Sequence, residues 1–514
     1  MKTAHILAEN AALKLENKSL KSKLQHAEAR LALLTQKTFH KTSEKHNDWP
    51  ELPFELNEAE VIVDAAQTIE TTIPEHTRKP RQSRLETQTP EHLPRVDVHH
   101  QPDVTDCPCC QTPMQASTPE IQEQLACLPS KFYVVRHHYH KLICSCKAQA
   151  PVTAARPARA LPKSGLHAIA LATWIEQKYD YGLPLYRLER MAKAAGVDVS
   201  RDTIASAIIK VSREYLQPLV NLMNEHILAY DMLWIDETTV QVLKEPGRAA
   251  ESKSYFWIRR GGPPDKPAIT VDYEMHRSHE ICRSLLPDFK GYLISDAYSG
   301  YLSAGKEKKI INVLCSDHAR RYFKEAYLTL DKPSRKKSIA NEALRRYAQL
   351  YKLEENAKKA DPVHRLQMRQ MKAKPLWQSF IQWMNEVQHQ GVAHDKTTKA
   401  INYLLNHQAG LQVYLTDARL PISNILAEHV AKHIAVVRKN FLFSDTPSGA
   451  TASANCFSVV QTAKLHGHQV HQYLAVVLSE LPKAQIPEQI EACLPWNITP
   501  KQVSERYQKL PILL

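Results

Sequence analysis

The sequence predicts a multidomain α+β protein. At 514 residues the chain is too long for one ordinary domain. Its hydrophobic periodicity also changes along the chain: it is helical near the N-terminus, strand-like between 231 and 323, and helical again between 324 and 415. Apolar residues make up 43% of the chain, which is enough to build buried cores in the regions with regular periodicity.

The composition indicates which partners and compartments are compatible with this chain. A formal net charge of +13 and a pI near 9.1 are typical of proteins that bind a polyanion, most simply nucleic acid. No apolar run approaches the ~18 residues of a membrane span, and the N-terminus lacks a signal-peptide core. We therefore expect no membrane partner. The ten cysteines are clustered, which favours a reducing cytoplasm, near the nucleoid, over a disulfide framework.

Residues 1–45 are expected to contain a coiled-coil helix. Apolar residues recur every seven positions between 5 and 36, with a companion set between them. The two sets are Ile6, Leu13, Leu20, Ala27, Leu34 and Asn10, Asn17, Leu24, Leu31. This a/d pattern predicts a homo-oligomer, and asparagine at such positions fixes the register. A single amphipathic helix packed on its own protein is the alternative. Seven prolines then indicate a linker over 46–106.

Residues 107–150 carry two close thiol pairs, which predict a zinc ribbon. The four expected ligands are Cys107, Cys110, Cys144 and Cys146. Tetrahedral Zn²⁺ needs four soft ligands, and two short pairs on two turns position them, with strand-like residues 131–136 between the turns. The second pair has one intervening residue in place of two. The rival ligands are Cys109, His137, His138 and His140.

Residues 160–230 are predicted to form several helices. An apolar pattern from Leu183 to Ala192 is followed by Gly196 and then by Ser200, a residue suited to cap a helix that begins at Arg201. Helix, glycine turn and capped second helix match a DNA-binding helix-turn-helix. An ordinary helical hairpin has the same signature.

Between 231 and 323 the period becomes strand-like. Strands are expected at 232–243, 254–259 and 268–273, followed by a helix near 278–286, a strand ending at Asp296 and a strand at 310–315. Three strands, a helix and two more strands is the order of a ribonuclease-H-like core. Asp236 interrupts the first apolar strand. A buried aspartate is costly unless a cation replaces its hydration, so Asp236 and Asp296 could share Mg²⁺; strand-end aspartates in turns are the alternative.

At this level of detail the sequence resembles the bacterial transposases of the insertion-sequence-66 family. The matching segments occur in family order over nearly the whole chain. They are 39–45, Leu93-Pro94-Arg95, 183–187, Asp236-Glu237-Thr238, 240–243, 291–293, 296–301, Cys315, His318-Ala319-Arg320-Arg321, Phe323, 438–443, 462–465 and Leu494-Pro495-Trp496. The resemblance implies a catalytic core over 231–445 with a helical insertion at about 324–415, and a family-specific region over 446–514.

The resemblance further implies an Asp, Asp, Glu triad that binds Mg²⁺ or Mn²⁺. Asp236 and Asp296 correspond to the two aspartates, and the motif beginning at Ile422 puts the third acid at Glu428. Around it the sequence departs from the family pattern. Ser423, Ile425 and His429 replace an aspartate, an asparagine and an arginine, and Lys432 and His433 replace an arginine and a proline. Glu354, in the helical insertion, is the rival third acid.

The implied activity is cleavage of element ends and joining of the freed 3′-hydroxyl to target DNA. His318, Arg320 and Arg321, then Arg438 and Lys439, are the expected phosphate contacts. Accessory proteins from the same element are possible partners. One alternative is a domesticated, catalytically inactive protein that only binds DNA. The other is a structure-specific nuclease that cuts without joining.

Overall fold

The computed structural model describes residues 132–138, 141–142, 152–153, 158–162, 164–308, 310–392 and 394–511. The elements below belong to one compact unit of the chain. The predicted coiled coil at 5–36 and linker at 46–106 lie outside the described residues. So do the predicted zinc ligands Cys107, Cys110, Cys144 and Cys146, together with Cys109 and His140.

The strand-like expectation for residues 131–136 is wrong for the part that is described. Residues 132–138 form no regular structure, and all but one of them are exposed, so the apolar side chains there have no sheet to pack on. A short antiparallel pair forms instead between β1 (Lys141–Leu142) and β2 (Val152–Thr153), in which Lys141 pairs with Thr153.

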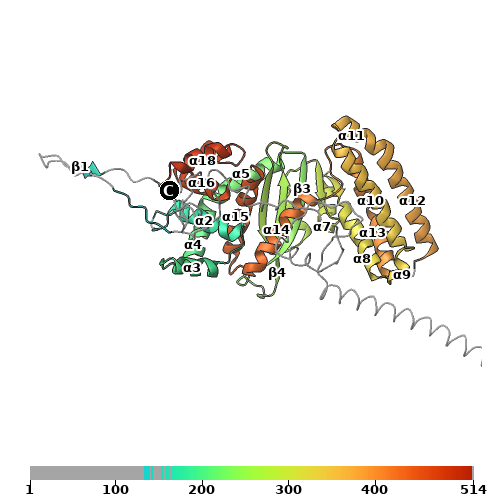
Figure 1. Ribbon diagram of the computed structural model, residues 1–514, viewed down its shortest axis with the longest axis horizontal. Helices are drawn as coiled ribbons and strands as arrows, with labels where there is room; N and C mark the ends of the chain where they lie inside the picture. Colours follow the sequence, from blue (N-terminus) through green and yellow to red (C-terminus); the bar gives the residue numbers. More distant parts are fainter. Residues whose placement is uncertain are drawn as a thin grey trace, which may run out of the picture. The chain divides into compact units, whose positions relative to one another are not determined.

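A five-stranded sheet forms the centre of the described fold (Figure 1). Its strands are β3 (Met232–Gln241), β4 (Lys253–Gly261), β5 (Ala268–Glu274), β6 (Tyr292–Ser295) and β7 (Ile311–Leu314). Their order across the sheet is β5-β4-β3-β6-β7. β3, β4 and β5 are antiparallel neighbours, whereas β6 and β7 run parallel to β3. The predicted strands and the helix between them, α6 (His279–Ser284), are therefore confirmed.

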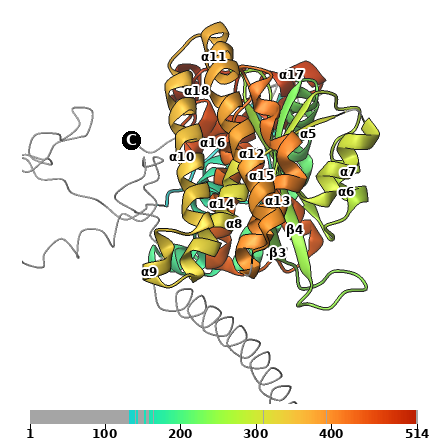
Figure 2. The same ribbon diagram turned by 90° about the vertical axis from the view of Figure 1, so that its right-hand side faces the viewer.

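The two faces of the sheet are covered by different helices. Leu233 and Ile235 of β3 pack into a core with the segment of α6 and α7 (Ser299–Lys308). Met232 belongs to a second core on the opposite face, with residues of the helical insertion. Alternate residues of a strand point to opposite faces, so this division of β3 follows directly from its sequence. Figure 2 shows α6 and α7 on the side of β3 and β4 away from α8 and α13.

The helical insertion follows β7 as predicted. It comprises α8 (Ser316–Thr329), α9 (Lys332–Arg335), α10 (Ile339–Lys358), α11 (Pro362–Met368), the π-helical turn η3 (Arg369–Ala373), α12 (Lys374–Gln390), α13 (Asp395–Gln412) and η4 (Val413–Leu415). Its aromatic core includes Phe323, Tyr347, Trp377 and Phe380, with Trp377 and Phe380 stacked at 6.0 Å between ring centroids. This core is continuous with apolar residues of β6 and β7, so the insertion is anchored on one end of the sheet.

The chain then returns to the sheet. α14 (Ile425–Phe441) lies across β3 and β4 (Figure 1). α15 (Pro447–Leu465) packs along the edge strand β5, where the Oγ atoms of Ser458 and Thr462 accept hydrogen bonds from the backbone amides of Val271 (2.8 Å) and Ile269 (3.0 Å). An edge strand exposes unpaired backbone groups, and these two side chains satisfy them.

A further helical layer joins the two ends of the described chain. Its helices are α2 (Ala168–Tyr179), α3 (Leu185–Ala194), α4 (Arg201–Val211), the π-helical turn η2 (Ser212–Leu216), α5 (Gln217–Leu228), α16 (Val470–Glu480), η5 (Leu481–Lys483), α17 (Pro487–Glu491) and α18 (Pro500–Gln508). The predicted cap is confirmed, because Ser200 Oγ accepts from the amide of Thr203 at 3.2 Å. Within the described residues, no helix combines the length and apolar character needed to cross a bilayer.

Candidate active site

Asp236 and Asp296 meet because of the strand register. In the parallel ladder between β3 and β6, Trp234 pairs with Ile294, an offset of sixty positions (294 − 234). The same offset separates Asp236 from Asp296 (296 − 236), which follows the last residue of β6. Neighbouring strands lie about 4.8 Å apart, so the two carboxylates emerge side by side.

The Asp236 carboxylate is in an environment that disfavours its charged form. Leu233 and Ile235, three positions and one position before it on β3, face α6 and α7. Because side chains alternate along a strand, Asp236 faces the opposite side, toward α14. Burial raises the pKa of Asp236 well above its usual value, and the negative charges of Glu237, Glu428 and Asp296 raise it further. The amide of Glu237 opposes this by donating to Oδ1 at 2.9 Å. A divalent cation would offset both the loss of hydration on burial and the repulsion between the carboxylates.

Glu428 is held beside these aspartates by the start of α14. Asn424, immediately before the helix, is fully buried, and its Nδ2 donates to the carbonyl of Ile235 at 2.9 Å. The backbone amide of Asn424 donates to Cys315 Sγ at 3.2 Å, and the Cys315 thiol in turn donates to Glu428 Oε1 at 3.2 Å. Burial and the charge of Glu428 raise the pKa of Cys315 well above its usual value, so the thiol remains a proton donor.

Two side chains of α8 approach the same acid. His318 Nδ1 lies 3.5 Å from Glu428 Oε1, and Arg321 Nη2 lies 3.9 Å from Oε2. The Arg321 side chain is 56% exposed, so its guanidinium can also reach a ligand in solution. Cys315, His318 and Glu428 also offer three atoms that could hold one metal ion, since those atoms lie within 4.8 Å of one another.

Asp296 accepts one backbone hydrogen bond and lies near one guanidinium. The amide of Tyr298 donates to Oδ1 at 3.0 Å, and Arg277 Nη2 lies 4.0 Å from Oδ2. Arg277 also forms an ion pair with Glu237, which accepts a hydrogen bond from the hydroxyl of Tyr301. Arg277, Glu237 and Tyr301 were not predicted as site residues from the sequence. Alternation along β3 could have indicated that Glu237 is buried, but Arg277 lies in a loop and gives no signal.

The remaining predicted phosphate contacts lie on α8 and at the end of α14. Arg320 approaches the ring of Tyr351 at 5.8 Å. Arg438 and Lys439 lie in the last turn of α14, and ten residues of helix put Arg438 about 15 Å from Glu428 along the axis. Of the predicted phosphate contacts, His318 and Arg321 therefore lie beside Glu428, whereas Arg438 and Lys439 lie at the far end of its helix.

Glu354 is engaged elsewhere. Its two oxygens accept from Arg369 Nε at 3.0 Å and Nη2 at 2.7 Å, with both side chains almost completely buried. The same guanidinium donates to carbonyls of Tyr414, Asp417 and Leu420. This is a structural ion pair that ties α10 to η3 and to the segment before α14.

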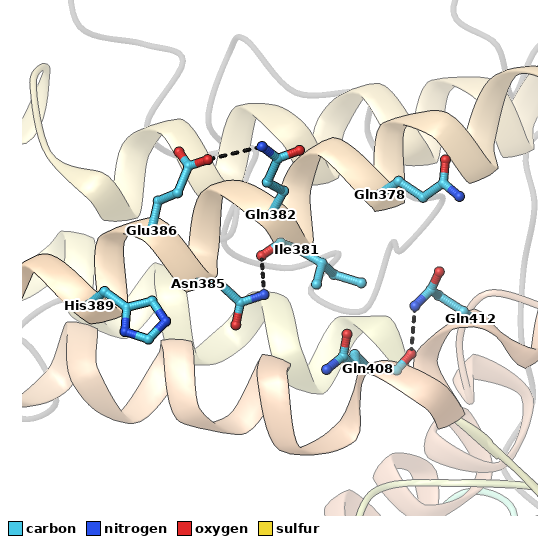
Figure 3. Close-up of a pocket in the computed structure, with 8 residues that line it drawn as sticks. All are labelled: Gln378, Ile381, Gln382, Asn385, Glu386, His389, Gln408 and Gln412. Atoms are coloured by element: carbon cyan, nitrogen blue, oxygen red, sulfur yellow. Dashed lines mark hydrogen bonds between the residues drawn. The ribbon is translucent and has the colours of Figure 1, made fainter.

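A polar pocket of about 510 Å³ lies on the helical insertion (Figure 3). Amide side chains of α12 and α13, such as Gln382 and Gln408, dominate its lining. It contains none of the carboxylates described above.

Comparison with known proteins identifies the family. Residues 163–452 match the model described as Transposase IS66 family, which is more than half of the chain. The chain belongs to the IS66 transposase family. Residues 458–496 match the IS66 C-terminal element, 105–147 the zinc-finger binding domain of transposase IS66, and 26–98 the Transposase C of IS166 homeodomain.

Relatives in Sinorhizobium fredii are similar to this chain over most of its length. The uncharacterized protein y4hP is 27% identical over 463 residues, which covers 87% of this chain and 82% of the relative. The uncharacterized protein y4qI is 28% identical over 426 residues, covering 80% and 77%. IS66 membership supports a transposase role with DNA as partner, and it implies a structural zinc and a divalent metal.

Proposed function

We propose that this IS66 chain cleaves the ends of its insertion element and joins the freed 3′-hydroxyl to target DNA. Its catalytic core would be a ribonuclease-H-like fold over 231–445, and Asp236, Asp296 and Glu428 would be its catalytic acids. The observation that best supports this proposal is the convergence of three carboxylates from β3, the end of β6 and α14.

The donor set fits Mg²⁺ or Mn²⁺. Both ions prefer carboxylate oxygens, and burial and then neighbouring carboxylates raise the pKa of Asp236, so its charged form would be stabilised by a cation. Bound ions would activate the attacking oxygen and stabilise the leaving oxygen of an in-line displacement.

The other residues would position DNA. Arg321 is exposed enough to contact a phosphate while it remains close to Glu428, and the fork of a guanidinium suits two phosphate oxygens. His318 would assist from the same helix. Arg320, Arg438 and Lys439 would contribute contacts farther along the duplex, with salt-sensitive affinity.

The remaining domains would supply DNA binding and assembly. The coiled coil of residues 1–45 would make a homo-oligomer, the linker 46–106 would connect it to the zinc ribbon of 107–150, and the helices of 160–230 would contact DNA. The four cysteine ligands would hold a structural zinc, and the region 446–514 would support the core.

The second candidate function is a DNA-binding regulator with an inactive core. It is motivated by Ser423, Ile425 and His429, which depart from the family pattern. Glu428 is contacted by Cys315, His318 and Arg321, and none of these is a replaced position. For this reason we favour the active enzyme.

The test is cleavage and joining of a duplex that carries the terminal repeat of the encoding element. Asp236→Asn, Asp296→Asn and Glu428→Gln should each abolish both steps while duplex binding is retained. Glu355→Gln, an exposed carboxylate on α10, is the matched control and should behave as the parent. A parent protein that binds ends but never cuts them with Mg²⁺ or Mn²⁺ would support the regulator instead.

A further inference from the structure

A second carboxylate next to Asp236 is buried on the opposite side of β3. Glu237 follows Asp236, and alternation along the strand turns its side chain toward the core that contains Leu233, Ile235 and α7. The Glu237 side chain is only 9% exposed. Its Oε2 accepts from the hydroxyl of the fully buried Tyr301, and its Oε1 pairs with Arg277. Glu237 is therefore fixed in place.

Arg277 lies between Glu237 and Asp296. One nitrogen, Nη2, makes the ion pair with Glu237 and lies 4.0 Å from Asp296 Oδ2. The ring of Tyr298 stacks against the guanidinium at 3.7 Å, and the Tyr298 hydroxyl donates to the carbonyl of Arg277 at 3.0 Å. Glu237 and Asp296 therefore compete for the guanidinium of Arg277, which lies closer to Glu237.

This division leaves Asp296 Oδ2 available. A direct hydrogen bond would need about 2.8 Å between nitrogen and oxygen. The distance of 4.0 Å between Arg277 Nη2 and Asp296 Oδ2 exceeds this by roughly 1 Å. If Glu237 lost its charge, Asp296 would be the carboxylate nearest to a guanidinium that Tyr298 still holds. A bound guanidinium and a divalent cation would then compete for the same oxygen.

We infer that Glu237 is a positioning residue that holds Arg277 away from Asp296 and so keeps Asp296 available to a divalent cation. The inference rests on the proposed function, because it requires Asp296 to be a metal ligand. It assigns to Glu237 and Arg277 a role that differs from simple stabilisation of the fold.

The test measures Mn²⁺ binding by electron paramagnetic resonance of the free ion, using the full-length, zinc-loaded chain. The variants are Glu237→Gln, Arg277→Gln and the double variant. Glutamine at 237 keeps an acceptor for Tyr301 but loses the charge that holds Arg277. Glu237→Gln should weaken Mn²⁺ binding at least about fivefold, and the double variant should restore it to within about twofold of the parent, because a coupled pair is not additive.

A purely structural pair predicts a different pattern. The double variant would then be as impaired as Glu237→Gln or more so, and that result would overturn the inference. Unchanged Mn²⁺ binding in Glu237→Gln would overturn it as well. Thermal denaturation of each variant shows whether the chain is folded when binding is measured.

Asp296→Asn separates this inference from the proposed function. If Asp296→Asn leaves Mn²⁺ binding unchanged, the proposed metal site is wrong. If Asp296→Asn weakens binding but Glu237→Gln does not, the metal site stands and only the role of Glu237 is refuted.

Discussion

Replacing Glu354 by alanine should lower the stability of the helical insertion without removing a catalytic group. The change leaves the guanidinium of Arg369 buried with its three carbonyl partners but without a counter-charge. Removing one member of a buried, hydrogen-bonded ion pair costs about 3–5 kcal/mol. The unfolding entropy is about 2.1 cal/mol/K per residue, so for the 382 residues from Tyr133 to Leu514 (514 − 132) each kcal/mol lowers Tm by about 1.2 °C, and Tm should fall by roughly 4 to 6 °C.

The assay is thermal denaturation followed by circular dichroism, with cleavage measured well below the transition. Glu355→Ala, one position along α10 and exposed, is the control and should change stability by less than about 0.5 kcal/mol. Glu354→Gln keeps an acceptor for the Arg369 guanidinium and should therefore lose less stability than Glu354→Ala. A Glu354→Ala protein with the parental Tm but no cleavage would refute the reasoning and make Glu354 the third acid.

Three further predictions concern other parts of the chain. The full-length protein should contain about one zinc per chain by mass spectrometry, and serine at the predicted cysteine ligands should abolish it; full zinc retention would contradict that assignment. Deleting residues 1–36 should lower the mass found by light scattering, because the heptad seam is the expected oligomer contact; an unchanged mass would locate assembly elsewhere. Burial lowers the pKa of Lys178 from 10.5 to about 8, so the unfolded chain binds more protons between these values and stability should rise with pH across that window. Lys178→Met should therefore stabilise the protein by about 1–3 kcal/mol at pH 7. The pKa shift sets the upper bound of ~3 kcal/mol, and the Phe441 ring, whose centroid lies 3.6 Å from the ammonium, reduces it by stabilising the charge. The stability gain should disappear above pH 10.5, and a gain that persists there would show that packing is the cause.

The strands that carry Asp236 and Asp296 could be predicted from the sequence because their patterns are local. Alternation of apolar residues located all five strands of the sheet, and the spacing of Asp236 and Asp296 equals the register offset between β3 and β6. The sequence could not give that register by itself, since pairing between β3 and β6 depends on how α6 and the intervening loops fold. Phe132 to Arg136 had an equally strand-like composition but form no strand and are mostly exposed, which is consistent with β propensity depending on a surface to pack on.

Glu428 could not be assigned from local pattern. It lies in the first turn of a helix, where an acid is ordinary, and only the family resemblance singled it out. Its contacts involve Cys315 and His318, more than one hundred residues earlier. Arg277 is harder still, because a loop arginine gains significance only when β5, β3 and the end of β6 are brought together.

The departures around Glu428 and the preserved contacts can be reconciled. Among the motif positions, Asn424 is retained, and it is the residue that joins α14 to Ile235, next to Asp236. Ser423 is buried before the helix, and His429 has a lowered pKa caused by burial and by the charges of Lys432 and Arg260. The charged groups that act on His429 are Lys432 and Arg260, so the replacement of an arginine there removes a positive charge among other cations. We therefore expect the departures to change the local charge without displacing Glu428, whose contacts come from Cys315, His318 and Arg321.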